Sequence, residues 1–132
     1  MGKGSDGERE LCSTLWEMGY ATLRAPGSGS IQRASPDLVA IRTSYVLYEI
    51  HTVEMKANGD GTANFSQNEI EALELWSERA GATPWVVVKP DLRQHEQWYC
   101  MQTKDLHQTP NLNYSLRKQD WDECLSLSEA FG

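Results

Sequence analysis

The sequence predicts an α/β fold in which a mixed sheet is flanked by helices. Two stretches have apolar residues at three- and four-residue spacing, which is typical of amphipathic helices. Short runs rich in Val, Ile and Tyr lie between and after them and favour strands. The order along the chain is helix, three strands, helix, strand and one further strand, which implies a single mixed sheet with helices packed on it. A length of 132 residues suits one domain, residues 1–132, with one hydrophobic core.

The first predicted helix runs from Asp6 to Met18. Ser5-Asp6-Gly7-Glu8 has the form of a capping box ahead of the apolar periodicity. Residues 20–24 then alternate like a strand, and the small residues 25–30 break regular structure in a loop that exposes backbone amides.

The middle of the chain predicts two strands and a second helix. Pro36 opens a short strand over residues 37–42, and a longer strand follows over residues 45–56. After a turn at residues 58–61, Ser66-Gln67-Asn68-Glu69 repeats the capping-box pattern and begins a helix that ends at Gly81. The apolar stripe of this helix is expected to be core or dimer surface; it consists of Ile70, Leu73 and Trp76.

The last third of the chain is less informative. Residues 84–89 form a continuous apolar run, which is typical of a central strand covered on both faces. Residues 98–101 predict another strand, and residues 120–130 a last helix that docks on the body of the protein. The remaining tail, within residues 110–132, is polar and stays unassigned.

Composition excludes several classes of protein. No apolar run is long enough to span a membrane and the N-terminus has no secretory signal, so we expect a cytoplasmic protein with no membrane partner. Three widely spaced cysteines support neither a disulfide framework nor a zinc site. The net charge of −7 argues against a general binder of polyanions. Residues 1–43 nevertheless hold equal numbers of acidic and basic groups, so this third can present a cationic face.

The strongest local pattern is Pro36-Asp37 at a strand start, followed 17 and 19 residues after Asp37 by Glu54 and Lys56. Residues i and i+2 of a strand share a face, so Glu54 and Lys56 project together while Met55 faces the other side. The two carboxylates and the backbone carbonyl of Met55 can supply oxygen ligands for Mg²⁺. Lys56 can orient a water or stabilise charge on a phosphorane. The alternative is a turn-ending Asp37 with a solvated ion pair on an edge strand.

A series of further motifs surrounds this pattern. It consists of Lys3-Gly4-Ser5, Glu8-Arg9-Glu10-Leu11, Gly19-Tyr20, Arg24, Gly27-Ser28-Gly29, Pro36-Asp37-Leu38-Val39-Ala40 and Glu54-Met55-Lys56, continued by Gln67, Leu73, Gly81, Pro84 and Val88-Lys89-Pro90. In its order the series resembles the archaeal Holliday junction resolvases, which are PD-(D/E)XK nucleases. The resemblance covers about residues 2–90. It implies a restriction-endonuclease-like fold and a homodimer that binds a four-way DNA junction and nicks two opposed strands with Mg²⁺ or Mn²⁺, without a small-molecule cofactor.

The resemblance also implies roles for single residues. Glu8 matches an acid that contributes to the metal site, and Gln67 matches a glutamine near that site; a helix cap and a helix start are the alternatives. Ser28 matches a serine implicated in catalysis, with Ser30 as the less favoured neighbour. Arg9 and Arg24 match arginines that contact DNA phosphates. The complete predicted DNA-binding set is Lys3, Arg9, Arg24, Ser28, Ser30 and Arg33.

One departure concerns the segment between Asp37 and Glu54, which is longer than is common in the family. Glu49-Ile50-His51 lies where a shorter hairpin would place Glu-x-Lys. Because residue 51 is His, we assign the motif to Glu54 and Lys56 and expect no ligand role for His51. Other functions stay open: a nuclease of the same fold that cuts flaps, ends or foreign duplex DNA, a noncatalytic junction-binding module, and an interaction domain unrelated to DNA.

Overall fold

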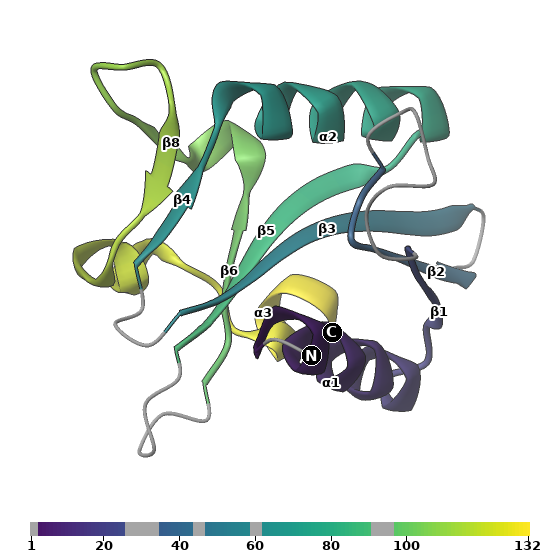
Figure 1. Ribbon diagram of the computed structural model, residues 1–132. Helices are drawn as coiled ribbons and strands as arrows, with labels where there is room; N and C mark the ends of the chain where they lie inside the picture. Colours follow the sequence, from purple (N-terminus) through teal and green to yellow (C-terminus); the bar gives the residue numbers. More distant parts are fainter. Residues whose placement is uncertain (1–2, 26–34, 44–46, 59–61, 91–96) are drawn as a thin grey trace.

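The computed structural model describes residues 3–25, 35–43, 47–58, 62–90 and 97–132, with the backbone alone at residues 3–5 and 58. Its main sheet has the strand order β1-β2-β3-β5-β6, and β3 and β5 run parallel while the other neighbours are antiparallel (Figure 1). The predicted mixed α/β architecture is therefore confirmed. These strands are β1 (Ala21–Arg24), β2 (Leu38–Thr43), β3 (Tyr48–Asn58), β5 (Thr83–Pro90) and β6 (Tyr99–Gln102).

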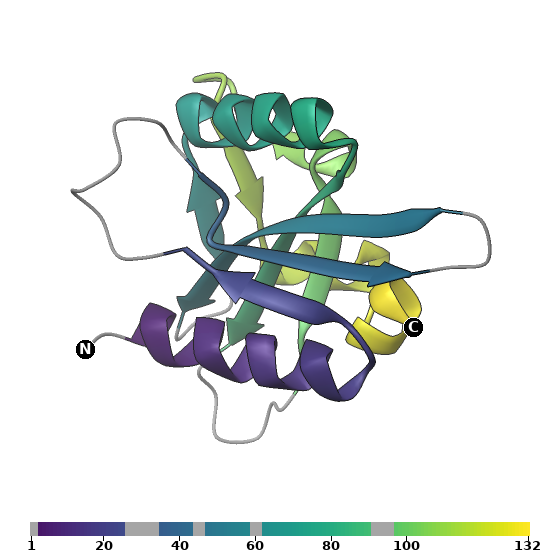
Figure 2. The same cartoon turned by 90° about the vertical axis from the view of Figure 1, so that its right-hand side faces the viewer.

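Helices cover both faces of this sheet. Helix α1 (Lys3–Glu17) and the short α3 (Leu127–Phe131) lie on one face, and α2 (Gln67–Ala80) lies on the other (Figure 2). Strand β5 is apolar over residues 85–88 because alternate residues enter different cores. Trp85 and Val87 join the core beneath α1 and α3, whereas Val86 and Val88 join the core beneath α2. The predicted central strand is confirmed.

Helix α2 begins and ends at its predicted residues because both signals are local. The Ser66 hydroxyl accepts a hydrogen bond from the Glu69 backbone N–H (3.0 Å), and the Glu69 carboxylate accepts one from the Ser66 N–H (3.3 Å). Gly81 ends the helix with φ of 68°, a left-handed conformation that glycine adopts without strain. The predicted first capping box is wrong: α1 already begins at Lys3, so residues 5–8 lie inside the helix.

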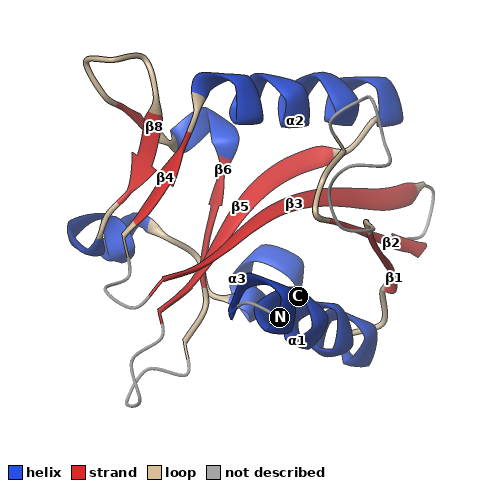
Figure 3. Cartoon of the chain, in the orientation of Figure 1, coloured by secondary structure: helices blue, strands red, loops and turns tan. Residues whose placement is uncertain are grey.

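The C-terminal region differs most from the prediction. A second, three-stranded sheet joins β4 (Ala63–Phe65), β8 (Tyr114–Leu116) and β7 (His107–Gln108), in that order. Instead of one helix over residues 120–130, a 3₁₀ segment, Lys118–Glu123, precedes the short α3, and another 3₁₀ segment, Thr103–Asp105, follows β6 (Figure 3). The helix is interrupted because Leu125 pairs with Cys100 through backbone hydrogen bonds of 2.8 Å in both directions. Phe131, at the end of α3, is fully buried.

No helix among the described residues is long and apolar enough to cross a membrane.

Candidate active site

The register of β2 against β3 brings the predicted acidic residues together. Leu38 pairs with Val53, so Asp37, directly before β2, lies beside the Glu54 to Lys56 segment of β3. Asp37 Oδ2 accepts a hydrogen bond of 2.9 Å from the Met55 backbone N–H. Strand β3 lies between β2 and β5, so the alternative of an ion pair on an edge strand is wrong.

The predicted division of faces along β3 is confirmed. Met55 is 4% exposed and packs in the core beneath α1. Glu54 points to the α2 side, where it lines a pocket of about 240 Å³ together with Ser35, Asn68 and Glu69. Lys56 Nζ lies 3.5 Å from Glu69 Oε2 on the same side. The site therefore combines the end of one loop, the middle of an interior strand and the first turn of α2.

Burial and mutual repulsion dominate the electrostatics of the site. Burial raises the pKa of Asp37 to about 6, against the hydrogen bond from Met55 that lowers it, and the charge of Glu8 adds to the rise. Burial also raises the pKa of Glu54 to about 8, and the charges of Asp37 and Glu69 raise it further. Lys56 opposes both shifts without cancelling them. Two carboxylates in this situation favour a bound cation, which would offset their repulsion.

A ready-made cluster of metal ligands is not present in the described part of the chain. No group of three or more His, Cys, Asp or Glu side chains there is arranged to hold a metal ion. The donor set that the structure offers is two carboxylates next to a strand carbonyl. Many enzymes bind Mg²⁺ through a similar set of ligands, one or two carboxylates, with water and substrate phosphate completing the coordination.

Glu8 and Arg24 form an ion pair beside the acids. Arg24 Nε donates to Glu8 Oε1 at 2.9 Å, and the side chains are 30% and 18% exposed. Glu8 thus faces the sheet, where Arg24 lies on β1. It acts on Asp37 and Glu54 through its charge, while its carboxylate binds the arginine.

The remaining predicted residues are placed as follows. Arg9 is on the exposed side of α1, 3.6 Å from Asp6. The Gln67 side-chain amide donates to Glu71 at 3.0 Å on the exposed surface of α2. Ser28, Ser30, Arg33 and the side chain of Lys3 lie outside the described residues. The sequence did not single out Glu69 as a site residue, although it is the N3 acid of the predicted capping box. Its capping role explains its presence there, so the sequence pattern gave no sign of a second role.

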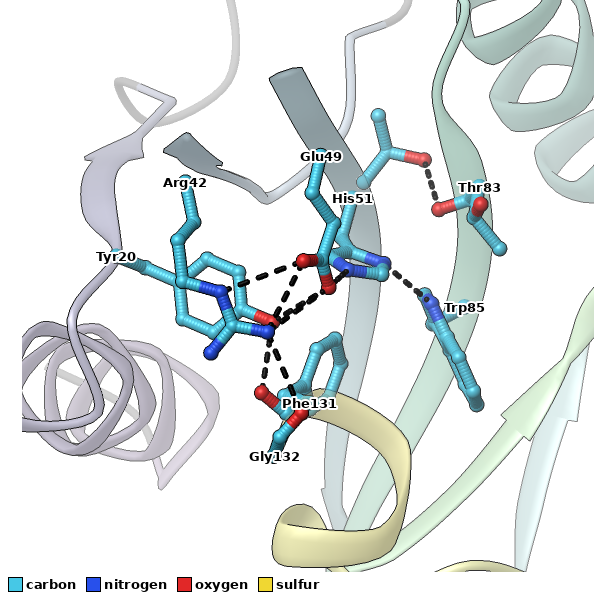
Figure 4. A network of polar contacts seen from close by, with 9 residues as sticks. Tyr20, Arg42, Glu49, His51, Thr83, Trp85, Phe131 and Gly132 are labelled. Atoms are coloured by element: carbon cyan, nitrogen blue, oxygen red, sulfur yellow. Dashed lines mark hydrogen bonds and ion pairs between the residues drawn. The ribbon is translucent and has the colours of Figure 1, made fainter. Parts of the chain in front are cut away.

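The other end of β3 carries Glu49 and His51, the motif that the sequence analysis set aside (Figure 4). Arg42 donates to Glu49 through Nε and Nη2 at 3.0–3.3 Å, and the His51 ring lies 2.8 Å from Glu49 Oε1. Trp85 Nε1 donates to His51 Nδ1 at 2.9 Å. Burial opposes ionisation of Glu49, but hydrogen bonds from His51, Arg42 and Tyr20 lower its pKa to about 2. Each of these side chains forms a hydrogen bond with another member of the network, which supports a structural role.

The amino-acid sequence of the chain is similar to those of known proteins. A family model described as archaeal Holliday junction resolvase (Hjc) matches residues 1–132. Proteins named crossover junction endodeoxyribonuclease Hjc are similar to the chain. The one from Archaeoglobus fulgidus is 27% identical over 98% of this chain and 90% of its own length. The one from Sulfolobus acidocaldarius is 33% identical over 60% of this chain and 54% of its own length.

The similarity extends to the fold. A solved structure of Archaeoglobus fulgidus Hjc, titled a Holliday junction resolvase from an archaeal hyperthermophile, superposes with a TM-score of 0.83 at 25% identity. It covers 98% of this chain and 100% of that chain. The match therefore continues well past residue 90, where the sequence analysis found no resemblance.

Proposed function

The chain belongs to the archaeal Holliday junction resolvase family, and from this premise we propose that residues 1–132 form one nuclease domain that cuts four-way DNA junctions by metal-dependent hydrolysis. The observation that carries the proposal is the pair Asp37 and Glu54. Both are buried enough to have raised pKa values, and both lie beside Lys56. Buried carboxylates whose charge is only partly compensated cost stability, and a binding or catalytic role explains why they are present.

Mg²⁺ fits this donor set best, with Mn²⁺ as an alternative. Asp37, Glu54 and the backbone carbonyl of Met55 would hold the ion, all of them hard oxygen donors. When bound, the ion would polarise the scissile phosphodiester and lower the pKa of a bound water. Its charge would also remove the repulsion that raises the pKa of Glu54.

Lys56 supplies the positive charge that phosphoryl chemistry needs on the same face as Glu54. Its ammonium group can hold the attacking water in place or stabilise the charge that develops on the phosphate oxygens. Arg24 stands beside the acids in its pair with Glu8, where it can bind a DNA phosphate adjacent to the cut. Glu8 would then fix the direction of the guanidinium group. Contacts of this kind position the DNA backbone and carry no base specificity.

We also propose a homodimer, because a two-fold protein can bring one site to each of two opposed strands. The face of β1, β2 and β3 beyond the edge of α2 is apolar and exposed: Leu23, Ile41 and Tyr48 are 71%, 39% and 72% exposed. Strand pairing puts them on the same face as Glu54. A second copy packed there would cover this patch.

The dimer is tested by a double substitution, Leu23→Glu with Ile41→Glu, followed by analytical ultracentrifugation. Wild-type protein should sediment as a dimer and the variant as a folded monomer, checked by circular dichroism. A monomeric wild-type protein, or a dimeric variant, would contradict this placement of the interface.

The function is tested with a labelled four-way junction, a flap and a linear duplex, each with Mg²⁺ and with EDTA. We expect paired nicks in the junction that need the metal and are absent for Asp37→Asn, while the variant still binds the junction. Equal cutting of all three substrates would favour a nuclease of the same fold with another substrate. Binding without cleavage by the wild-type protein would favour a noncatalytic module.

A further inference from the structure

We propose that Glu69 is a positioning residue for the cleavage reaction, and that it acts by holding the ammonium group of Lys56 beside Glu54. This inference rests on the proposed nuclease function and assigns a role to a residue outside the Asp37, Glu54 and Lys56 motif.

The two oxygens of the Glu69 carboxylate have different partners. Oε1 accepts the hydrogen bond from the Ser66 backbone N–H and completes the capping box of α2. Oε2 lies 3.5 Å from Lys56 Nζ. The helix cap therefore fixes the carboxylate, and the fixed carboxylate presents an oxygen to the lysine. The N-terminus of α2 also stabilises a negative charge at this position.

Lys56 needs such a hold because its ammonium group sits at the end of four flexible methylenes. It meets Glu69, and it also lies 5.7 Å from the centre of the Phe65 ring. Phe65 is itself 1% exposed and so provides a rigid wall. Lys56 and Glu69 are 34% and 39% exposed, so the pair adds little to stability. Its effect is to select one direction for the ammonium group, which is what a catalytic lysine requires.

The capping role and the positioning role of Glu69 can be separated by a substitution to glutamine. Glutamine also serves at the third position of a capping box, because only one side-chain oxygen is needed there. Glu69→Gln therefore keeps the cap and removes the charge that holds Lys56. The chain offers a matched control: Glu129 occupies the same position in the capping box of α3, where it accepts from the Ser126 N–H at 3.0 Å.

The experiment measures single-turnover cleavage of a four-way junction at saturating protein and Mg²⁺, for wild-type protein, Glu69→Gln and Glu129→Gln. We expect Glu69→Gln to cut about tenfold more slowly, with junction affinity in EDTA and thermal unfolding close to wild type. Glu129→Gln should cut at the wild-type rate. If Glu69 is only a cap, both variants will cut at the wild-type rate, and faster cutting by Glu69→Gln would show that the ion pair restrains Lys56. Either result overturns the proposal.

A double-substitution cycle shows whether Glu69 acts through Lys56. Lys56→Met removes the group being positioned, so adding Glu69→Gln to it should cause no further loss of rate. A further tenfold loss would mean that Glu69 acts on something else, and would also overturn the proposal. Cleavage by the wild-type protein in the same series separates this failure from failure of the proposed function, since only the latter leaves the junction intact with all proteins.

Discussion

Replacing Glu54 by glutamine should stabilise the metal-free protein at high pH while abolishing cleavage. Folding raises the pKa of this carboxyl group from 4.5 to about 8, so the native state favours the protonated form. Below pH 4.5 the group is neutral in both folded and unfolded chains and costs nothing. As the pH rises toward 8 the unfolded chain ionises freely and the native state does not, so stability is lost. Glutamine stays neutral and avoids that loss.

The size of the effect follows from the same values. A shift of the pKa from 4.5 to about 8 corresponds to about 5 kcal/mol at most. The charges of Asp37 and Glu69 cause part of this pKa shift, and these two side chains can readjust once Glu54 is neutral. Solvent and salt screen the remaining electrostatic contribution. We therefore expect Glu54→Gln to raise the free energy of unfolding by about 2–3 kcal/mol at pH 8.5 and by less than about 0.5 kcal/mol at pH 4.

The assay is urea unfolding followed by circular dichroism in EDTA, from pH 4 to 8.5. A surface control, Glu78→Gln on the exposed side of α2, should stay within about 0.5 kcal/mol of wild type throughout. Adding Mg²⁺ at pH 8 should stabilise the wild-type protein and not Glu54→Gln, because binding to the native state alone increases its stability. A variant less stable than wild type at pH 8.5, or equally offset at every pH, would refute the reasoning.

Three further predictions concern DNA contact and the core. Arg24→Gln should weaken junction binding and reduce the slope of log affinity against log salt by about one; an unchanged slope would place the DNA elsewhere. Phe131→Ala should lower the free energy of unfolding by about 3–5 kcal/mol in urea titrations, since its ring is fully buried, and a loss below about 1 kcal/mol would mean that α3 does not dock. His51→Leu leaves the Trp85 indole N–H without its acceptor, which should cost about 1–3 kcal/mol. Its cleavage rate should equal that of wild type, and a large loss of rate would reopen a catalytic role for His51.

The sequence predicted those elements whose causes are local. The capping box at Ser66 and the glycine after Ala80 both act within a few residues, so α2 was bounded correctly. Strands β4, β7 and β8 are two or three residues long, and they exist because distant segments pair, such as Phe65 with Tyr114. No periodicity can develop over so short a length, and the sequence analysis therefore missed the second sheet.

The site residues also divide into those that the local sequence predicts and those that it does not. Asp37, Glu54 and Lys56 were predicted together because the period of a strand sets which side chains share a face, and the register of β2 against β3 then joins them. The role of Gln67 near them stays a prediction; its amide bonds Glu71 one turn along α2, as i,i+4 pairs on a helix surface commonly do. Glu69 was missed because its contact with Lys56 crosses from a helix to a strand.

Strand β3 carries two Glu-x-base motifs, and their surroundings separate structure from function more sharply than their sequences do. Glu49 has the neighbours that an ionised carboxylate needs, and its pKa falls to about 2. Glu54 lies five residues away among other acids, and its pKa rises to about 8. A side chain kept only for stability would be expected to resemble Glu49. Glu54 instead lowers stability between pH 4.5 and 8, because it ionises freely in the unfolded chain and stays protonated in the native state. The cost is therefore informative, because a cation bound beside Glu54 would offset the burial and the repulsion that raise its pKa.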